Sequence, residues 1–276
     1  MQHGQSRVII ENVYPELDGG KFYIKRVVGE YVHVEADIFA DGHDVVAAIL
    51  KYRFRSAKKW QQVAMKPIGN DRWEGGFIVQ QQGLYDYAIE AWVDHALTWQ
   101  HGAIRKIDDG QHITSELLEG IQYIDKILPM CTEEEQGLLN YLKQLFTDET
   151  RYHEAVLHVK SENLHQIFLN YPTRNFSVTY PSLQVYVDRH KALFSTWYEF
   201  FPRSASQEPG KHGTFKDCIR LLPRVAAMGF DVLYFPPIHP IGEVNRKGKN
   251  NATTAQPDDV GSPWGIGSAK GGHKDI

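Results

Sequence analysis

The sequence predicts a multidomain protein in which an immunoglobulin-like β-sandwich carries a helical-bundle insertion and precedes a strand–helix–strand unit. Three patterns support this fold class. Apolar and polar residues alternate along short segments of residues 1–110, and apolar residues recur every three or four positions in 111–172. A strand–helix–strand pattern then spans 195–235. With 276 residues, the chain is long enough for about two domains.

The predicted β-sandwich covers residues 1–110. Its clearest strand is 31–38, where valine, alanine and isoleucine alternate with polar or aromatic residues, as on a half-buried strand. Turn signals separate it from further expected strands at 45–52, 73–79 and 85–93. Several short strands at such spacing are typical of a sandwich. The following tryptophans are expected either in its core or stacked on sugar rings: Trp60, Trp73, Trp92 and Trp99.

The predicted helical insertion covers residues 111–172. Thr132 and Glu135 have the spacing of a capping box, in which the hydroxyl and the carboxylate each bind a backbone amide at the helix start. Ser161 is the expected cap of a later helix. The alternating pattern of a strand then returns, and 173–190 is the predicted returning strand and linker.

The sequence pattern of residues 195–235 predicts a βα unit. Buried strands are expected at 195–200 and 231–235, joined by a helix over 214–229. One face of that helix is apolar and should be buried: Phe215, Cys218, Ile219, Leu222 and Ala226. Parallel sheets place their ligand loops at the carboxyl ends of strands. A site is therefore expected in the loop that starts at Pro236.

This loop is rich in donor groups, contributed by Arg246, Lys247, Lys249, Asn250 and Asn251. Ammonium, guanidinium and amide groups on a glycine-hinged backbone suit polyhydroxyl or phosphorylated ligands. The alternative is a solvated basic loop without a ligand.

Composition narrows the function classes. A formal net charge of −4 argues against nucleic-acid binding. No apolar run is long enough to span a bilayer, and the amino terminus has no signal-peptide pattern. The two cysteines, Cys131 and Cys218, lack metal-ligand spacing and fit a reducing cytoplasm. The histidines are also scattered without the spacing of metal ligands, so no metal site is expected.

Several segments in this order and spacing make the chain resemble a known family. They are FPRS (201–204), HGTF (212–215), GFDVLYFPPIHPIG (229–242), NRKGKNN (245–251) and GSPWGIGSAKGGH (261–273). Together they resemble the bacterial α-1,4-glucan:maltose-1-phosphate maltosyltransferases, a family of α-amylase-like glycoside hydrolases. Segments near the amino terminus, such as VEADIFADGHD (34–44), resemble the same family.

The resemblance implies that 191–276 begins a catalytic (β/α)₈ barrel, which is incomplete in this chain. It implies transfer of maltosyl units from α-maltose 1-phosphate to the non-reducing end of an α-1,4-glucan such as glycogen. Phosphate is released by a retaining double displacement, without a metal or a cofactor. A homodimer formed through the amino-terminal and helical parts is also implied.

The resemblance assigns one substrate contact, Lys247, to the donor sugar. It leaves loop support to Arg246, Lys249, Asn250 and Asn251. Trp264 either stacks on a sugar or packs under the loop. The family's nucleophilic Asp and its Glu acid/base have no counterpart in this sequence, so no catalytic residue is assigned. We therefore expect an amino-terminal portion of the enzyme that is inactive alone.

Two other functions remain open at this point. The PPIHPIG segment (236–242) alone would also fit another α-amylase-family hydrolase or a branching enzyme. The sandwich and helices would also fit a non-catalytic glucan-binding or dimerisation module.

Overall fold

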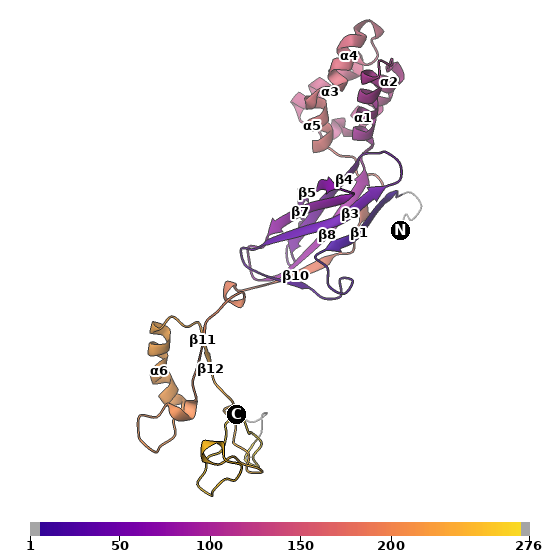
Figure 1. The fold of residues 1–276 in the computed structure, drawn as a ribbon. Helices are drawn as coiled ribbons and strands as arrows, with labels where there is room; N and C mark the ends of the chain where they lie inside the picture. Colours follow the sequence, from indigo (N-terminus) through magenta and orange to yellow (C-terminus); the bar gives the residue numbers. More distant parts are fainter. Residues whose placement is uncertain (1–5, 272–276) are drawn as a thin grey trace. The chain divides into compact units, whose positions relative to one another are not determined.

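The computed structural model describes residues 6–271 (Figure 1). The chain divides into two compact units, Met1–Arg189 and His190–Ile276. Gly272 and His273, which end the last motif, lie outside the described residues. No helix in the described part of the chain is long and apolar enough to cross a membrane. The bounds of the four segments expected from the sequence remain predictions.

Two β-sheets form the sandwich of the first unit. One sheet has the order β1-β3-β7-β6 and consists of β1 (Val8–Tyr14), β3 (Tyr31–Ala40), β7 (Arg72–Ile78) and β6 (Lys66–Gly69). The other has the order β2-β10-β8-β4-β5, with β9 paired to β8. It consists of β2 (Ile24–Val27), β10 (Leu183–Asp188), β8 (Gly83–Val93), β4 (Val46–Phe54), β5 (Gln61–Ala64) and β9 (Val178–Thr179). Only the β10–β2 pairing is parallel among the pairings of these described strands.

The core of the sandwich follows from the alternation in the sequence. Val32, Val34, Ala36 and Ile38 on β3 are at most 1% exposed, and their alternating neighbours are partly exposed. Successive side chains on a strand point to opposite faces, so this pattern assigns one face to the core. The predicted β-sandwich with a helical insertion is confirmed. Its finer assignment as immunoglobulin-like remains a prediction.

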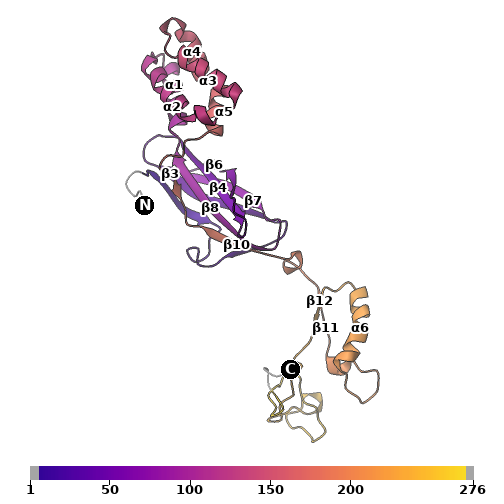
Figure 2. The ribbon, with the colours of Figure 1, turned by 180° about the vertical axis from the view of Figure 1, so that it is seen from behind.

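The helices of the first unit gather at one end of the two sheets (Figures 1 and 2). They are α1 (His95–Asp108), α2 (Thr114–Ile127), α3 (Glu133–Leu145), α4 (Tyr152–Val159) and α5 (Glu162–Asn170), with short 3₁₀ turns η1 (Leu128–Met130) and η2 (Glu149–Arg151). They share a core of fully buried side chains that includes Leu139, Leu142 and Leu164. The predicted capping box of Thr132 and Glu135 and the Ser161 cap are both present.

Helix α1 begins at His95, inside the segment that the sequence pattern assigns to strands. The Asp94 carboxylate accepts a hydrogen bond from the Leu97 amide (3.0 Å) and so caps the helix. Trp99 consequently lies on this helix, where it is buried and packs against Phe168. Trp92 is also buried, so both of these residues belong to the core rather than to an exposed sugar platform.

In the second unit, strands β11 (Trp197–Glu199) and β12 (Val232–Tyr234) pair in parallel, and α6 (Phe215–Ala227) lies between them in sequence. Short 3₁₀ turns complete the unit: η3 (His190–Ala192), η4 (Pro202–Ser204) and η5 (Lys249–Asn251). The predicted strand–helix–strand pattern is therefore confirmed. The predicted burial of the strands is wrong, since no residue of β11 or β12 is buried and Trp197 is 60% exposed.

The apolar face of α6 is also largely exposed. Of its five predicted face residues only Cys218 is buried, and Ile219 is 62% exposed. A two-stranded sheet without a second layer, within the described residues, offers this helix too little apolar surface. Local polar bonds hold the unit instead: Thr214 and Asp217 form a capping box, and Asp231 accepts from Lys191 Nζ (2.5 Å).

Candidate functional site

The loop that starts at Pro236 follows the carboxyl end of β12, where the site was expected. Its two halves pair with each other: Ile241 and Ile266 form an isolated β-bridge, and the Gly242 amide donates to the Gly265 carbonyl oxygen at 2.6 Å. The intervening residues therefore form a closed ring rather than an extended tail.

The Arg246 side chain crosslinks the loop by hydrogen bonds to three backbone carbonyl oxygens. Its guanidinium donates to the oxygens of Gly242 (2.9 Å), Asp259 (3.2 Å) and Ile241 (3.4 Å). The fork of donors on an arginine is suited to such multiple contacts. These bonds occupy the Arg246 side chain within the loop.

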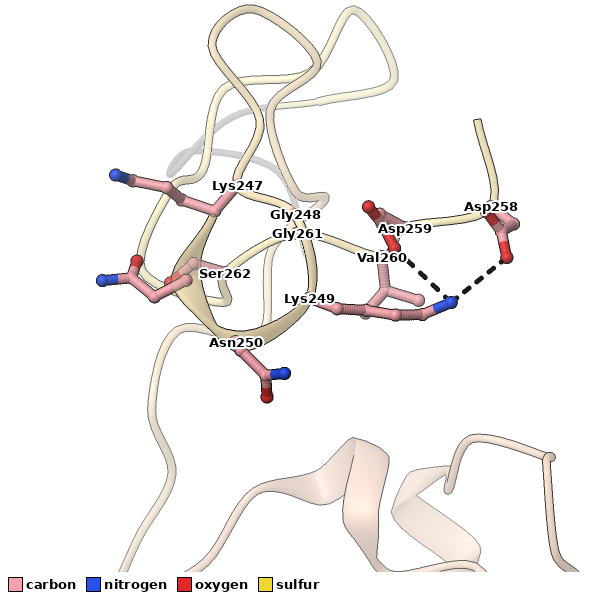
Figure 3. Close-up of a pocket in the computed structure, with 10 residues that line it drawn as sticks. Lys247, Gly248, Lys249, Asn250, Asp258, Asp259, Val260, Gly261 and Ser262 are labelled. Carbon is pink, nitrogen blue, oxygen red and sulfur yellow. Dashed lines mark hydrogen bonds and ion pairs between the residues drawn. The ribbon is translucent and has the colours of Figure 1, made fainter. Parts of the chain in front are cut away.

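An open hollow of about 390 Å³ lies inside this ring (Figure 3). It is lined by Lys247, Gly248, Lys249, Asn250, Asn251, Asp258, Asp259, Val260, Gly261 and Ser262. The turn that forms one wall has left-handed backbone at Asn250 (φ 54°) and Asn251 (φ 61°), a conformation that asparagine tolerates better than most residues. The Gly248 amide closes the turn by donating to the Ala252 oxygen at 2.9 Å.

Lys249 is neutralised by two carboxylates. Its ammonium lies 3.4 Å from Asp258 Oδ2 and 3.8 Å from Asp259 Oδ1, the pairs drawn as dashed lines in Figure 3. The Asp259 side chain is only 4% exposed, whereas that of Asp258 is 75% exposed. A cation held between two carboxylates is less available to an anionic ligand than a free one.

Lys247 differs from both of its basic neighbours. It lines the hollow and is exposed, and in Figure 3 its side chain points away from that of Lys249. Within residues 6–271, no hydrogen bond or ion pair engages its ammonium. Of the three cations in the RKGK segment, Lys247 is therefore the one whose donors remain available to a ligand.

Trp264 is exposed and does not line the hollow. It lies in a tight turn in which the Gly265 amide donates to the Ser262 oxygen at 2.9 Å. The structure thus brings together Lys247, Lys249, Asn250 and Asn251 at one hollow, with Arg246 behind them and Trp264 outside. The assigned roles of these residues remain predictions.

Sequence reasoning missed three polar side chains of the hollow, those of Asp258, Asp259 and Ser262. The available signal was a pair of adjacent carboxylates in the same loop as the basic segment. Their contact with Lys249 depends on the closure of the loop, which local sequence patterns do not report.

The hollow can donate hydrogen bonds to hydroxyl or phosphate oxygens through the Lys247 ammonium. The asparagine amides on the same turn add further donors. Across residues 6–271, no group of three or more His, Cys, Asp or Glu side chains could hold a metal ion.

Comparison with known proteins identifies the family. Residues 6–189 match the model of α-1,4-glucan:maltose-1-phosphate maltosyltransferase, domain N/S. A protein of that name from Chlorobaculum tepidum is 48% identical over 276 residues, covering 99% of this chain and 41% of the relative. Its namesake from Methylacidiphilum infernorum is 44% identical over 274 residues, covering 99% and 41%.

The similarity also extends past the N/S region, because these alignments cover nearly all of the chain and therefore the loop with the hollow. The chain spans 41% of the length of these two relatives. The matches confirm the resemblance carried by the motifs: the chain belongs to the α-1,4-glucan:maltose-1-phosphate maltosyltransferase family.

Proposed function

We propose that this chain provides the amino-terminal part of an enzyme that transfers maltosyl units from α-maltose 1-phosphate to α-1,4-glucan. The acceptor is the non-reducing end of a glucan such as glycogen, and phosphate is the leaving group. Family membership supports the reaction class. The two free, buried cysteines, Cys131 and Cys218, suit a reducing compartment such as the cytoplasm.

The observation that carries this proposal is the unpartnered ammonium of Lys247 at the rim of the hollow. Arg246, the preceding residue, fixes the backbone through three carbonyl contacts. An ammonium on a four-carbon stem can donate to two sugar hydroxyls at once. We propose that Lys247 binds the non-reducing end of the donor maltosyl unit, and that Arg246, Lys249, Asn250 and Asn251 support the loop.

We also propose that residues 191–276 begin a (β/α)₈ barrel. The parallel pair β11–β12, with α6 between its strands in sequence, is the repeating unit of that fold. The exposed apolar face of α6 suits a helix whose neighbours in the barrel lie elsewhere in the enzyme. A barrel takes about 250 residues, so most of it would come from the part of the relatives that this chain does not span.

A retaining mechanism needs two carboxylates roughly 5 Å apart, one as nucleophile and one as acid/base. Asp258 and Asp259 of the hollow do not suit these roles, because both pair with Lys249. We propose that the rest of the barrel supplies both catalytic groups, and that the amino-terminal and helical parts support a homodimer. On this proposal, residues 1–276 alone do not turn over substrate.

A hybrid enzyme tests the function. Residues 1–276 are joined to the remaining part of the Chlorobaculum tepidum relative, which is 48% identical over this region. The hybrid should release phosphate from α-maltose 1-phosphate only when glycogen is present, and it should lengthen the glucan. A hybrid that hydrolyses starch and ignores maltose 1-phosphate would contradict the proposal and favour another α-amylase-family activity.

A further inference from the structure

The two residues on either side of Lys247 both lie close to Asp259. On one side, Arg246 Nη1 donates to the Asp259 carbonyl oxygen at 3.2 Å. On the other, a Cβ added to Gly248 would lie 3.2 Å from Asp259 Oδ2 and 2.4 Å from the Thr254 oxygen. The backbone at Lys247 is thus bonded to the Asp259 carbonyl through Arg246, while Gly248 on the other side has no room for a side chain next to the Asp259 carboxylate.

The Asp259 carboxylate is itself held in one place. Its side chain is 4% exposed, and its Oδ2 accepts a hydrogen bond from the Gln256 amide at 2.8 Å. Its Oδ1 is buried without a hydrogen bond and faces the Lys249 ammonium at 3.8 Å. A buried ionised carboxylate is costly unless a counter-charge compensates it. Lys249 provides that charge.

Asp258 provides a natural comparison. It precedes Asp259 directly, and its carboxylate pairs with the same lysine at 3.4 Å. It differs in being 75% exposed and in lacking, within the described residues, the hydrogen bonds that Asp259 makes with Arg246 and Gln256. Substituting each aspartate in turn therefore distinguishes the loss of a negative charge near Lys249 from the loss of the contacts that anchor the loop.

We infer that Asp259 is a positioning residue for Lys247, with Lys249 as its counter-ion. The inference rests on the proposed function, in which Lys247 binds the donor sugar. In this inference the Asp259 carboxylate, bonded to the Gln256 amide and paired with Lys249, holds the Asp259 carbonyl in place for Arg246 and so positions the backbone from which the Lys247 side chain extends. Displacing a binding group by about 1 Å can cost roughly 100-fold in rate, so removal of this anchor should weaken donor use strongly.

The first test uses the chain of 276 residues without ligand. Trypsin cleaves after Arg246, Lys247 and Lys249, so it reports opening of the loop. Asp259→Ala should accelerate cleavage there by roughly tenfold or more, while cleavage in the loop at Lys58 and Lys59 of the first unit provides the internal reference. Asp258→Asn should leave both rates near those of the parent. Equal acceleration by the two variants would overturn the anchoring role.

The second test is a double-mutant cycle in the hybrid enzyme. Asp259→Ala should raise KM for α-maltose 1-phosphate by roughly tenfold and leave KM for glycogen unchanged. A loss of folded enzyme would instead lower apparent kcat at constant KM. In a Lys247→Ala background, Asp259→Ala should have little further effect, because the group that it positions is absent. Equal, additive losses in both backgrounds would overturn the inference.

The two tests distinguish the possible failures. A parent hybrid that releases no phosphate contradicts the proposed function and with it the role of Lys247 in binding. Loop proteolysis still decides whether Asp259 anchors the loop. An active hybrid in which Asp259→Ala changes neither KM nor proteolysis keeps the proposed function and overturns only this inference.

Discussion

The two units of the chain begin a helix with the same kind of cap, but they differ in how much buried apolar surface packs against that helix. Helix α3 begins with a capping box at Thr132, and α6 begins with one at Thr214. Behind α3 lie fully buried side chains of the helical core. The second unit has few buried apolar side chains among its described residues: Pro202, Ala205, Cys218, Val225 and Pro236.

This difference shows that the sequence signals that locate a helix do not by themselves make it stable. Caps and periodicity specify where a helix begins and which face is apolar. Most of the stability of a helix in a protein comes from packing that face. We therefore expect the first unit to unfold cooperatively and the second to open locally at much lower cost.

The largest expected effect comes from a matched pair of leucine substitutions, one in each unit. Leu142 on α3 is fully buried, whereas Leu222 on α6 is exposed. Leu142→Ala should lower the free energy of unfolding of the first unit by about 2–5 kcal/mol, because it leaves a cavity. Leu222→Ala should change that of the second unit by no more than about 0.5 kcal/mol. Urea unfolding followed by circular dichroism measures both, and similar losses would break the comparison.

A smaller effect is expected from removing the same cap in each unit. Thr132→Ala and Thr214→Ala should each cost about 1 kcal/mol. In α3, the loss should appear as a lower unfolding midpoint of the whole first unit. In α6, it should appear as faster hydrogen exchange confined to residues 214–228. Faster exchange of both units after Thr214→Ala would show that they are coupled.

The smallest effect is a pH dependence of the second unit. The bond from Lys191 and the Thr196 amide lower the pKa of Asp231 to about 2. Since an unfolded aspartate titrates near pH 4, the contribution of Asp231 is fully present above that pH. It is lost as pH falls through about 2. Hydrogen exchange of residues 190–235 should therefore accelerate between pH 4 and 2, relative to Asp231→Asn, which lacks the transition. Parallel profiles for the two proteins would contradict the assignment.

Much of the first unit could be predicted from the sequence, because alternation and periodicity there reflect real burial. The buried face of β3 and the caps at Thr132 and Ser161 are examples. Helix α1 was missed since it follows β8 directly, with the single residue Asp94 as the cap between them. In the second unit, the apolar pattern correctly located the two strands and the helix. The predicted burial of these elements was wrong, because burial depends on packing partners that lie outside the patterned segment.

The site was predictable only in part. The position of the basic loop after a strand and the residue types at 246–251 were visible in the sequence. The pairing of Lys249 with Asp258 and Asp259 was not, because these residues meet only when Ile241 and Ile266 pair. The distinction between an engaged Arg246, a neutralised Lys249 and an unpartnered Lys247 likewise required the folded loop.

The central claim is that the second unit presents Lys247 to the donor sugar. Steady-state kinetics of the hybrid enzyme test it most directly, with Lys247→Ala compared with the parent. Loss of charge-assisted hydrogen bonds should lower kcat/KM for α-maltose 1-phosphate by roughly 10- to 100-fold, with KM for glycogen unchanged. An unchanged kcat/KM for α-maltose 1-phosphate would contradict the claim.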